Sequence, residues 1–420
     1  MDTRQLEEAP RLPVLFKVSQ GFLLQMARIM PAVRRTRFAI SHACAAGLLL
    51  VGARLSVSAA AVRPSKESSI RGAMMGSLVA DALCLGTHYE YDAEKISKFY
   101  GGLDNYYAPG EKTGGQTHGV GWGARNFHGG NGNGPAKRKG EQTDYGDYNI
   151  LVLQHLADTA GNPQPFSLKD FVPKWQERMK TWTAWLCTQT RQTLQQVAQG
   201  APLDQIGGMS NAMAVRSAGM FGYYSSEEET VKAARTAMFT HRETSAHQGN
   251  EFFTRVTWRI INKGLSPRAA IEEVAKESPR FIQDKVKQAL DKVEEAMNPE
   301  SGLAKEKFAD DRAITSMARL WDVGKTEPIK VGKASPTEGT LPASVYFICK
   351  YNDLYKATRA NAEVGGDNAS RSVAIGMVLG AFQGLEGIPQ HLGKGSLVEW
   401  ERTMALLDKM PLLQGEKSEL

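Results

Sequence analysis

Residues 71–92 read RGAMMGSLVADALCLGTHYEYD, and this stretch decides the fold. Gly72, Gly76 and Ala80 recur every four residues, so in a helix they lie on one face. Each glycine inside a helix costs about 1 kcal/mol relative to alanine. Small residues in register therefore indicate that another backbone packs closely against this face.

A second stretch near the C-terminal end repeats this spacing. Residues 365–384 read GGDNASRSVAIGMVLGAFQG, in which Gly376, Gly380 and Gly384 recur at four-residue intervals. We expect the two helices to pack together at the centre of a bundle. The alternative is that the glycines are incidental features of separate helices.

Helical periodicity continues through most of the remaining sequence, and strand-like alternation is almost absent. The predicted fold class is therefore all-α. The expected helices cover residues 69–86, 144–160, 168–199, 205–222, 227–240, 244–263, 267–274, 279–297, 309–321, 338–363 and 369–384. One face of the 168–199 helix is interpreted as core and carries Phe171, Trp175, Trp182 and Trp185.

The formal net charge of +6 does not indicate nucleic-acid binding. Residues 1–65 hold nine Lys or Arg and three Asp or Glu, which accounts for the whole excess. The rest of the chain is formally neutral, so we expect no nucleic-acid partner. Cys84, Cys187 and Cys349 lie far apart without CxxC spacing, which predicts neither a disulfide framework nor a zinc site.

Residues 1–65 have the composition of a targeting leader. Residues 9–65 contain no acidic residue but many arginines, as in an organelle transit peptide. Arg34-Arg35 precede an uncharged run at 38–53 and the small-residue stretch SVSAAA, a pattern that resembles a twin-arginine or secretory signal. The run is shorter than the about 20 residues that span a bilayer, so we expect no permanent membrane span. A plastid destination, including the thylakoid lumen, is favoured; the mitochondrion and the secretory route are alternatives.

Residues 101–140 interrupt the helical pattern. They hold 13 of the 41 glycines, which predicts a long glycine-rich loop. The loop contains no GxxxxGK[ST], and no GxGxxG follows a strand, so a nucleoside triphosphate site is not predicted. The predicted organisation is a leader over 1–65, a helical domain over 66–400 that carries the loop, and a C-terminal tail over 401–420.

Two motifs place acids at expected helix starts: EQTDYGD at 141–147 and GGDNAS at 365–370. One interpretation is that these polar side chains cap the two helices. The other is that hard oxygen donors from both motifs come together and hold a divalent ion such as Mg²⁺. Spacing alone leaves both interpretations open. The donors concerned are Thr143, Asp144, Asp147 and Asp367.

At these residues the sequence resembles the ADP-ribosylglycohydrolase family, and within it the J1-crystallin-like branch. The resemblance implies an all-α orthogonal helical bundle with two Mg²⁺ or Mn²⁺ ions near its centre. It also implies removal of ADP-ribose from modified proteins, or hydrolysis of related ADP-ribose compounds, through an oxocarbenium-like sugar. The matching motifs run in family order over about residues 70–395: GSLVADALCLG with Asp81, QTDYGD, SNAMAVRSAGM from Ser210 to Met220, Thr240-His241, and GGDNAS.

The sequence departs from the family at the metal ligands that the resemblance implies. Tyr145 and Ala369 stand where the family motifs have their second aspartates. The two aspartates that match supply only half the charge of two divalent ions, so we expect one ion or none. The expected donors for Mg²⁺ or Mn²⁺ are Thr143, Asp144, Asp367 and Ser370.

His88 aligns with a family acid and is expected to act in catalysis, because its unperturbed pKa lies near neutrality. A hydrogen-bonded structural histidine explains His88 equally well, and Asp147 is the other expected proton shuttle. We expect Asn211 at the polar edge of the ligand cleft and interpret Arg216 as a solvated side chain. The expected substrate-binding residues are Asn211, Gly365, Gly366 and Asn368.

Two functions are compatible with these features. The first is a hydrolase that cleaves a glycosidic bond of ADP-ribose on a protein or small molecule, with an altered metal site. Tyr145 and Ala369 favour the alternative, a catalytically silent ADP-ribose-binding or crystallin-like structural protein. Both imply ADP-ribose or an ADP-ribosylated substrate as the partner.

Overall fold

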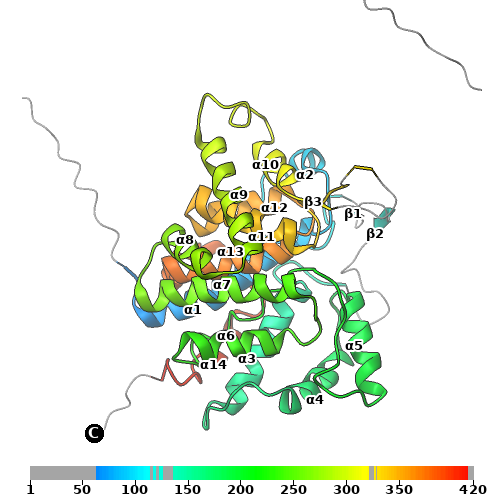
Figure 1. Cartoon of the computed structure of the whole chain (residues 1–420), viewed down its shortest axis with the longest axis vertical. Helices are drawn as coiled ribbons and strands as arrows, with labels where there is room; N and C mark the ends of the chain where they lie inside the picture. The colour runs from blue at the N-terminus through cyan, green and yellow to red at the C-terminus, as the bar shows by residue number, and fades with distance from the viewer. Residues whose placement is uncertain are drawn as a thin grey trace, which may run out of the picture. The chain divides into compact units, whose positions relative to one another are not determined.

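The computed structural model describes residues 63–113, 117–119, 123–125, 136–320, 326–327 and 329–414. Within these residues, fourteen α-helices and two short β-hairpins make up the regular structure apart from three 3₁₀ turns, which confirms the all-α fold class (Figure 1). The leader as far as residue 62 and most of the predicted glycine-rich loop lie outside the described residues.

The α-helices are α1 (Lys66–Cys84), α2 (Ala93–Tyr100), α3 (Asp144–Thr159), α4 (Leu168–Met179), α5 (Thr188–Ala198), α6 (Glu227–Ala237), α7 (Thr244–Lys263), α8 (Pro267–Glu277), α9 (Arg280–Met297), α10 (Ala309–Met317), α11 (Thr337–Tyr351), α12 (Leu354–Val364), α13 (Asn368–Gln383) and α14 (Trp400–Leu407). Antiparallel pairing joins the short strands β1 (Thr117–Gly119) with β2 (Gly123–Arg125), and β3 (Arg319–Leu320) with β4 (Ile329–Lys330).

Helices α1 and α13 lie side by side in the middle of the bundle, as their glycine spacing predicts (Figure 1). A Cβ atom on Gly72 would overlap the carbonyl oxygen of Gly380, and one on Gly76 would press on that of Gly376. The overlap is reciprocal, because Cβ atoms on Gly376 and Gly380 would strike the backbone of α1. We call these four glycines the glycine seam. The surrounding buried hydrophobic residues form one extensive core cluster.

The helix predicted over residues 205–222 is wrong. Gly207 has φ of 111°, a left-handed conformation that ends any helix there. The segment is instead extended and hydrogen-bonded to distant chain: Gly208 N donates to Thr240 O, and Met213 N donates to Ser335 O. Backbone pairing with residues more than 25 positions away replaces the local helical bonds.

Two predicted helices are each divided in the structure. The 168–199 segment unwinds between α4 and α5, and the 338–363 segment breaks at Asn352, whose φ is 47°. Asp353 then caps α12 by accepting a hydrogen bond from Lys356 N. Helices α2 and α14, of eight residues each, were not predicted.

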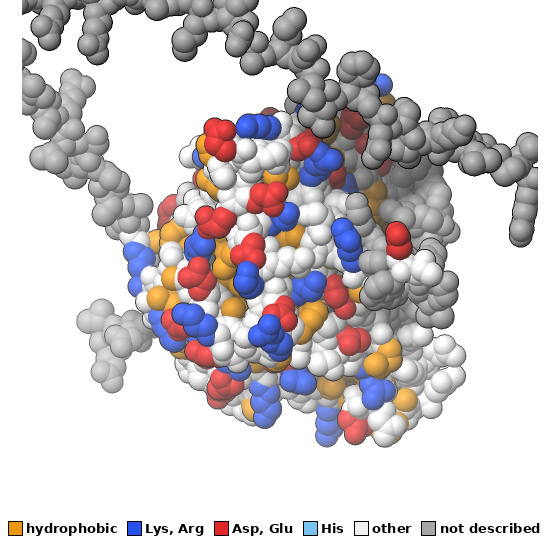
Figure 2. Space-filling view, turned by 45° about the horizontal axis from the view of Figure 1, so that its top comes forward, with side chains coloured by type: hydrophobic (Ala, Val, Ile, Leu, Met, Phe, Trp, Pro, Cys, Tyr) orange, Lys and Arg blue, Asp and Glu red, His pale blue; other side chains and the backbone are white. Residues whose placement is uncertain are grey.

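The first described residue, Arg63, contacts the helical body, and the division between leader and body stays a prediction. Arg63, counted with the leader, donates hydrogen bonds to the carbonyl oxygens of Ile260 and Ile261 near the end of α7. In the described part of the chain, no helix combines the length and hydrophobicity needed to cross a bilayer. On the face drawn in Figure 2, acidic and basic side chains are interspersed.

Candidate active-site cavity

The start of α3 is fastened to α1 through Asp81. The backbone N and the hydroxyl of Thr143 donate to the two carboxyl oxygens of Asp81, at 2.7 and 2.6 Å. The Thr143 hydroxyl also caps α3 by accepting a hydrogen bond from Tyr145 N. Burial raises the pKa of Asp81 to about 7, against the opposing effect of these hydrogen bonds. A side chain at Gly146 would overlap Asp81, so this contact requires glycine.

The start of α13 is capped by Asp367 and held by two glycines before it. Asp367 Oδ1 accepts a hydrogen bond from Ser370 N, and the Ser370 hydroxyl donates to the Asp367 main-chain oxygen. Gly365 and Gly366 have φ of 74° and 71°. Gly366 O accepts a hydrogen bond from Tyr89 N, so the glycines hold the turn that follows α1.

The two helix starts meet at Tyr145. Its hydroxyl donates to Asp367 Oδ2 at 3.0 Å, across more than 200 residues of sequence. Asp144, the residue before Tyr145, is buried, and its Oδ1 has no hydrogen-bond partner among the described residues. Burial, then the nearby charge of Asp367, raises the pKa of the Asp144 carboxyl well above its usual range. The raised pKa favours the protonated form of the Asp144 carboxyl over the carboxylate.

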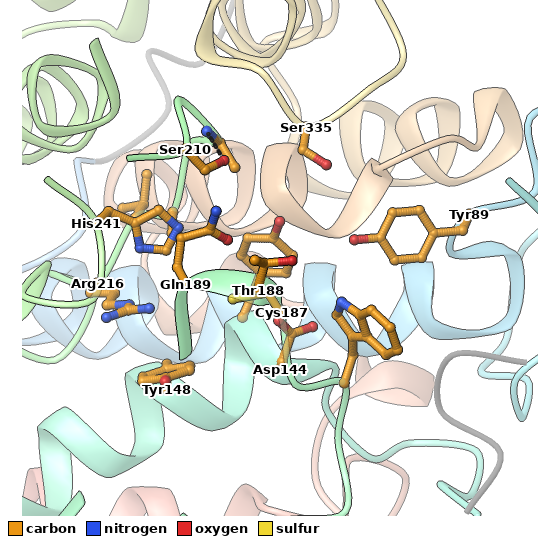
Figure 3. Close-up of a pocket in the computed structure, with 15 residues that line it drawn as sticks. Tyr89, Asp144, Tyr148, Cys187, Thr188, Gln189, Ser210, Arg216, His241 and Ser335 are labelled. Atoms are coloured by element: carbon orange, nitrogen blue, oxygen red, sulfur yellow. Dashed lines mark hydrogen bonds between the residues drawn. The ribbon is translucent and has the colours of Figure 1, made fainter. Parts of the chain in front are cut away.

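Asp144 lines a cavity of about 200 Å³, which we call the Asp144 cavity (Figure 3). Its walls come from the start of α3, the turn after α1, the segment leading into α5 and the extended segment 210–216. His241, between α6 and α7, and Ser335, just before α11, complete the lining. In the view of Figure 3, Tyr89 and Arg216 lie on opposite sides with Asp144 between them. The cavity is smaller than the about 300–1,000 Å³ typical of pockets that enclose a drug-sized ligand.

His88 directly precedes Tyr89 of the cavity wall in the chain and is not part of the lining itself. The Asn368 amide nitrogen donates to the Thr87 hydroxyl, so its oxygen faces His88 Nδ1 at 3.2 Å. A carbonyl oxygen only accepts, which places the proton of the neutral ring on Nδ1. Burial lowers the pKa of His88, against the opposing effect of Asp367, whose Oδ1 lies 3.9 Å away. Asn368 thus orients His88, and the ring is neutral at neutral pH.

Asp147, the other expected proton shuttle, is engaged elsewhere. It forms an ion pair with Lys137 at 2.6 Å and is not part of the cavity lining. Glu90, in the turn after α1, forms an ion pair with Lys95, also at 2.6 Å, and does not line the cavity either. A proton-shuttle function for His88 or Asp147 stays a prediction.

Arg216, and not Asn211, lies in the cavity wall. The Asn211 amide donates to Glu338 at 2.8 Å, and its main-chain oxygen accepts from Thr337. Arg216 is buried rather than solvated, which corrects the sequence interpretation. Its position follows from the extended path of residues 205–222, because a helix there would have turned the two side chains differently. Substrate binding by Asn211, Gly365, Gly366 or Asn368 stays a prediction.

Sequence reasoning missed several residues of the cavity wall, among them Tyr89, Trp185 and Cys187. Trp185 and Cys187 belong to the unwound segment before α5, and Trp185 was interpreted as core. Tyr89 has φ of 65°, which is uncommon for a residue with a side chain. Its position directly after His88, a predicted catalytic residue, was the one sequence feature that pointed to Tyr89 as a residue of the site.

The donor set around Asp144 does not fit two divalent ions. The hydroxyl groups of Thr143 and Ser370 are hydrogen-bonded to Asp81 and to the Asp367 main chain. The phenol of Tyr145 occupies one oxygen of Asp367. No three His, Cys, Asp or Glu side chains among the described residues are placed to hold a metal ion. Divalent ions of this class require several converging oxygen ligands.

Comparison with known proteins gives one family. The sequence profile described as ADP-ribosylglycohydrolase matches residues 62–419. A solved structure titled "ADP-ribosylglycohydrolase-related protein complex" superposes with a TM-score of 0.50 at 19% sequence identity, covering 83% of this chain and 99% of that chain. At this identity the likeness shows the fold alone. A search of curated proteins finds no match.

Proposed function

The chain belongs to the ADP-ribosylglycohydrolase family, and we propose that the Asp144 cavity hydrolyses a glycosidic bond of ADP-ribose on a protein or a small molecule. The observation that carries this proposal is the carboxyl group of Asp144 in the cavity wall. It is buried, its Oδ1 has no partner among the described residues, and its pKa is raised by burial. A carboxyl group whose protonated form is favoured in this way is suited to act as the general acid for a glycosidic leaving group.

The proposed reaction uses Asp144 twice. Asp144 transfers its proton to the leaving atom as the bond from that atom to the sugar carbon breaks, which leaves an oxocarbenium-like ribosyl group. Water then adds to the same carbon and gives its proton to the Asp144 carboxylate, which restores the acid. The phenol oxygen of Tyr145, whose proton is directed to Asp367, accepts a hydrogen bond from the sugar or the water.

The altered metal site belongs to this proposal. We infer that the cavity binds one divalent ion or none, because the hydroxyl groups expected as ligands are engaged by protein groups. Calorimetric titration of the full chain with Mg²⁺ or Mn²⁺ should therefore give at most one bound ion per chain. Two bound ions per chain would contradict the inference.

The test measures release of ADP-ribose by the full chain. The substrates are peptides in which ADP-ribose is linked to a serine hydroxyl or to an arginine guanidinium. We expect Asp144→Asn to lower kcat by about 100-fold or more, since a positioned general acid contributes about that much. The matched control is Asp158→Asn, a carboxylate on the same helix that pairs with Lys174 outside the cavity. Equal turnover by the wild type and Asp144→Asn would refute the catalytic assignment.

The alternative is a silent ADP-ribose-binding or crystallin-like structural protein, and assignment to the J1-crystallin-like branch stays a prediction. The hydrogen bond between Tyr145 and Asp367 favours this alternative, because it satisfies the acid without substrate. A thermal shift with ADP-ribose but no turnover would support silent binding. No shift and no turnover would support a structural protein.

Delivery to an organelle is also proposed. The acid-free, arginine-rich composition of residues 9–65 supports a plastid destination, with the mitochondrion and the secretory route as alternatives. Fusion of residues 1–65 to a fluorescent protein tests the destination directly.

The mixed surface charges of Figure 2 and the neutral body agree with the expectation of no nucleic-acid partner.

A further inference from the structure

Arg63 holds the end of α7. Its Nη2 donates to the main-chain oxygens of Ile260 and Ile261, at 3.2 and 3.1 Å. The last carbonyl groups of a helix have no partner within the helix, so a cation beside them is favourable. Gly264 then ends α7 with φ of 72°, and a Cβ atom there would overlap the Arg63 guanidinium. Arg63 is therefore a structural part of the helical body.

The two residues after Arg63 begin α1. Ser65 is the N-cap, and its side-chain oxygen accepts a hydrogen bond from Ser68 N at 3.0 Å. Pro64 packs beside Gly384 at the end of α13, where an added Cβ atom would lie 2.7 Å from the Pro64 Cβ. The start of α1 thus contacts the ends of both α7 and α13 (Figure 1). A cut in the chain that spares these contacts must precede Arg63.

The leader holds a cleavage motif directly before Arg63. Peptidases that remove export signals recognise small residues at the first and third positions before the cut, as in A-x-A. Within the leader, A-x-A occurs at 43–45 and at 59–61. The first copy lies inside the uncharged run, which an export signal needs intact as its apolar core. The second copy follows this run and ends at Ala61, two residues before Arg63.

We propose that a protease of the signal-peptidase type removes the leader by hydrolysing the Ala61–Val62 peptide bond. Water adds to the Ala61 carbonyl carbon as the bond to the Val62 nitrogen breaks, which leaves a carboxylate on the leader and an amine on the body. The cut lies four residues before the boundary expected from composition, and it retains Arg63. The inference rests on the proposed delivery of the chain and not on the proposed hydrolysis of ADP-ribose.

The position of this cut also distinguishes among the destinations. A-x-A cleavage is typical of export signals, whereas transit peptides are recognised by an arginine-rich composition that is poor in acids. The leader combines an arginine-rich stretch with a later export-type motif. Cleavage at Ala61–Val62 therefore favours the thylakoid lumen or the secretory route over the mitochondrion.

The N-terminus of the processed protein tests the site. The full chain with a C-terminal affinity tag is produced in plant cells and purified, and its first peptide is identified by mass spectrometry. We expect Val62 to be the first residue. An intact leader, or a first residue at any other position, would overturn the proposal.

Two variants separate the two copies of A-x-A. Ala61→Leu and Ala45→Leu both precede the described residues. A larger side chain clashes with a site shaped for alanine, so Ala61→Leu should lower the fraction of chains that begin at Val62 by at least about tenfold. Ala45→Leu, the matched control in the first copy, should leave this fraction unchanged. Equal processing of the two variants would refute the assignment.

Thermal unfolding of the full chain tests whether the body begins at Arg63. Arg63→Met removes both hydrogen bonds to α7 and should lower the melting temperature by about 1–3 °C. The control is Lys66→Met, which removes an exposed cation from the first turn of α1. It should not lower the melting temperature, because a cation at a helix N-terminus is unfavourable. Equal melting temperatures for the wild type and Arg63→Met would contradict the requirement that the cut spare Arg63.

The outcomes separate this inference from the proposed destination. Delivery of the fluorescent fusion to the plastid, together with a first residue other than Val62, would keep the destination and refute the site. A first residue of Val62 with delivery to the secretory route would keep the site and refute the plastid destination.

Discussion

The glycine seam and the Asp144 cavity are built partly from the same helix, yet they differ in how fully their atoms are packed and hydrogen-bonded. Along α13, the glycines at 376 and 380 touch the backbone of α1 with no space left. At its first turn, Asp367 reaches Tyr145 beside a cavity where polar atoms remain unpartnered. Among the described residues, no buried side-chain polar atom of the seam lacks a hydrogen-bond partner, whereas Asp144 Oδ1 and Arg216 Nε, from two residues of the cavity wall, lack one.

This difference separates stability from function. Close backbone packing tolerates no added atom, and its value lies in the folded state alone. Buried unsatisfied polar groups destabilise the folded state and are retained where something else is to be bound. Changes in the seam should therefore affect folding, and changes in the cavity should affect binding.

The largest effect is expected at the seam. Gly380→Val would place side-chain atoms inside the backbone of Gly72, so α1 and α13 would have to separate. We expect the free energy of unfolding to fall by about 4 kcal/mol or more, which exceeds ordinary overpacking because the obstacle is backbone. Urea denaturation followed by circular dichroism measures the loss.

The matched control for this change is Gly161→Ala. No atom outside its own neighbours lies within 4 Å of a Cβ at this position, and its φ is not left-handed. The free energy of unfolding should change by no more than about 0.5 kcal/mol. Similar losses in both variants would contradict the special role of the seam.

A smaller effect is expected from the pH dependence of Asp81, which joins α1 to the cavity. Its carboxyl ionises near 3.8 in the unfolded chain but near 7 in the folded protein. Between these values the native state binds more protons, so the free energy of unfolding falls as pH rises, and the loss is complete above about pH 7. From about pH 5 to pH 8 we expect the wild type to lose about 3 kcal/mol more than Asp81→Asn.

Comparison with the variant isolates Asp81 from other titrating groups. Burial lowers the pKa of His155 to about 4, which makes stability rise with pH through the same range. That contribution is common to both proteins and cancels in the difference. Equal pH profiles for the wild type and Asp81→Asn would show that the Asp81 carboxyl does not titrate as described.

The seam was predictable from sequence because its signal is local. Four-residue spacing of glycines fixes a helix face, and two such faces have one obvious way to pack. The capping of α3 and α13 was likewise readable from the Thr143 and Asp367 motifs. These features depend on residues within one or two turns of each other.

The cavity wall was not predictable in the same way. Arg216 faces the cavity because residues 208–213 pair with backbone near residues 240 and 335. Trp185 and Cys187 reach it because the chain unwinds between α4 and α5. Both depend on long-range contacts that override helical periodicity, so a helical interpretation assigned these side chains to the wrong surroundings.

The next variant tests whether the Tyr145 side chain occupies the space that a bound metal ion would otherwise fill. Tyr145→Asp gathers a third carboxylate beside Asp144 and Asp367, which creates a need for a divalent ion. Excess Mn²⁺, at about 100 times its Kd, should stabilise this variant by about 2.7 kcal/mol and leave the wild type unchanged. Tyr145→Phe, which removes the hydroxyl without adding charge, is the control. Thermal stabilisation of the wild type by Mn²⁺ would show that its donor set does hold an ion.

The smallest effect is expected at Asn211, beside the cavity wall. Its amide donates to Glu338, and Ser210 and Ala212 line the cavity in its place. Asn211→Ala should lower the free energy of unfolding by about 1 kcal/mol, the value of one hydrogen bond, and leave the Kd for ADP-ribose unchanged. Urea denaturation and calorimetry measure the two quantities on the same protein. A weaker affinity for the ligand with an unchanged free energy of unfolding would instead assign Asn211 to ligand binding, as expected from the sequence. Its side chain would then have to turn from Glu338 to the ligand.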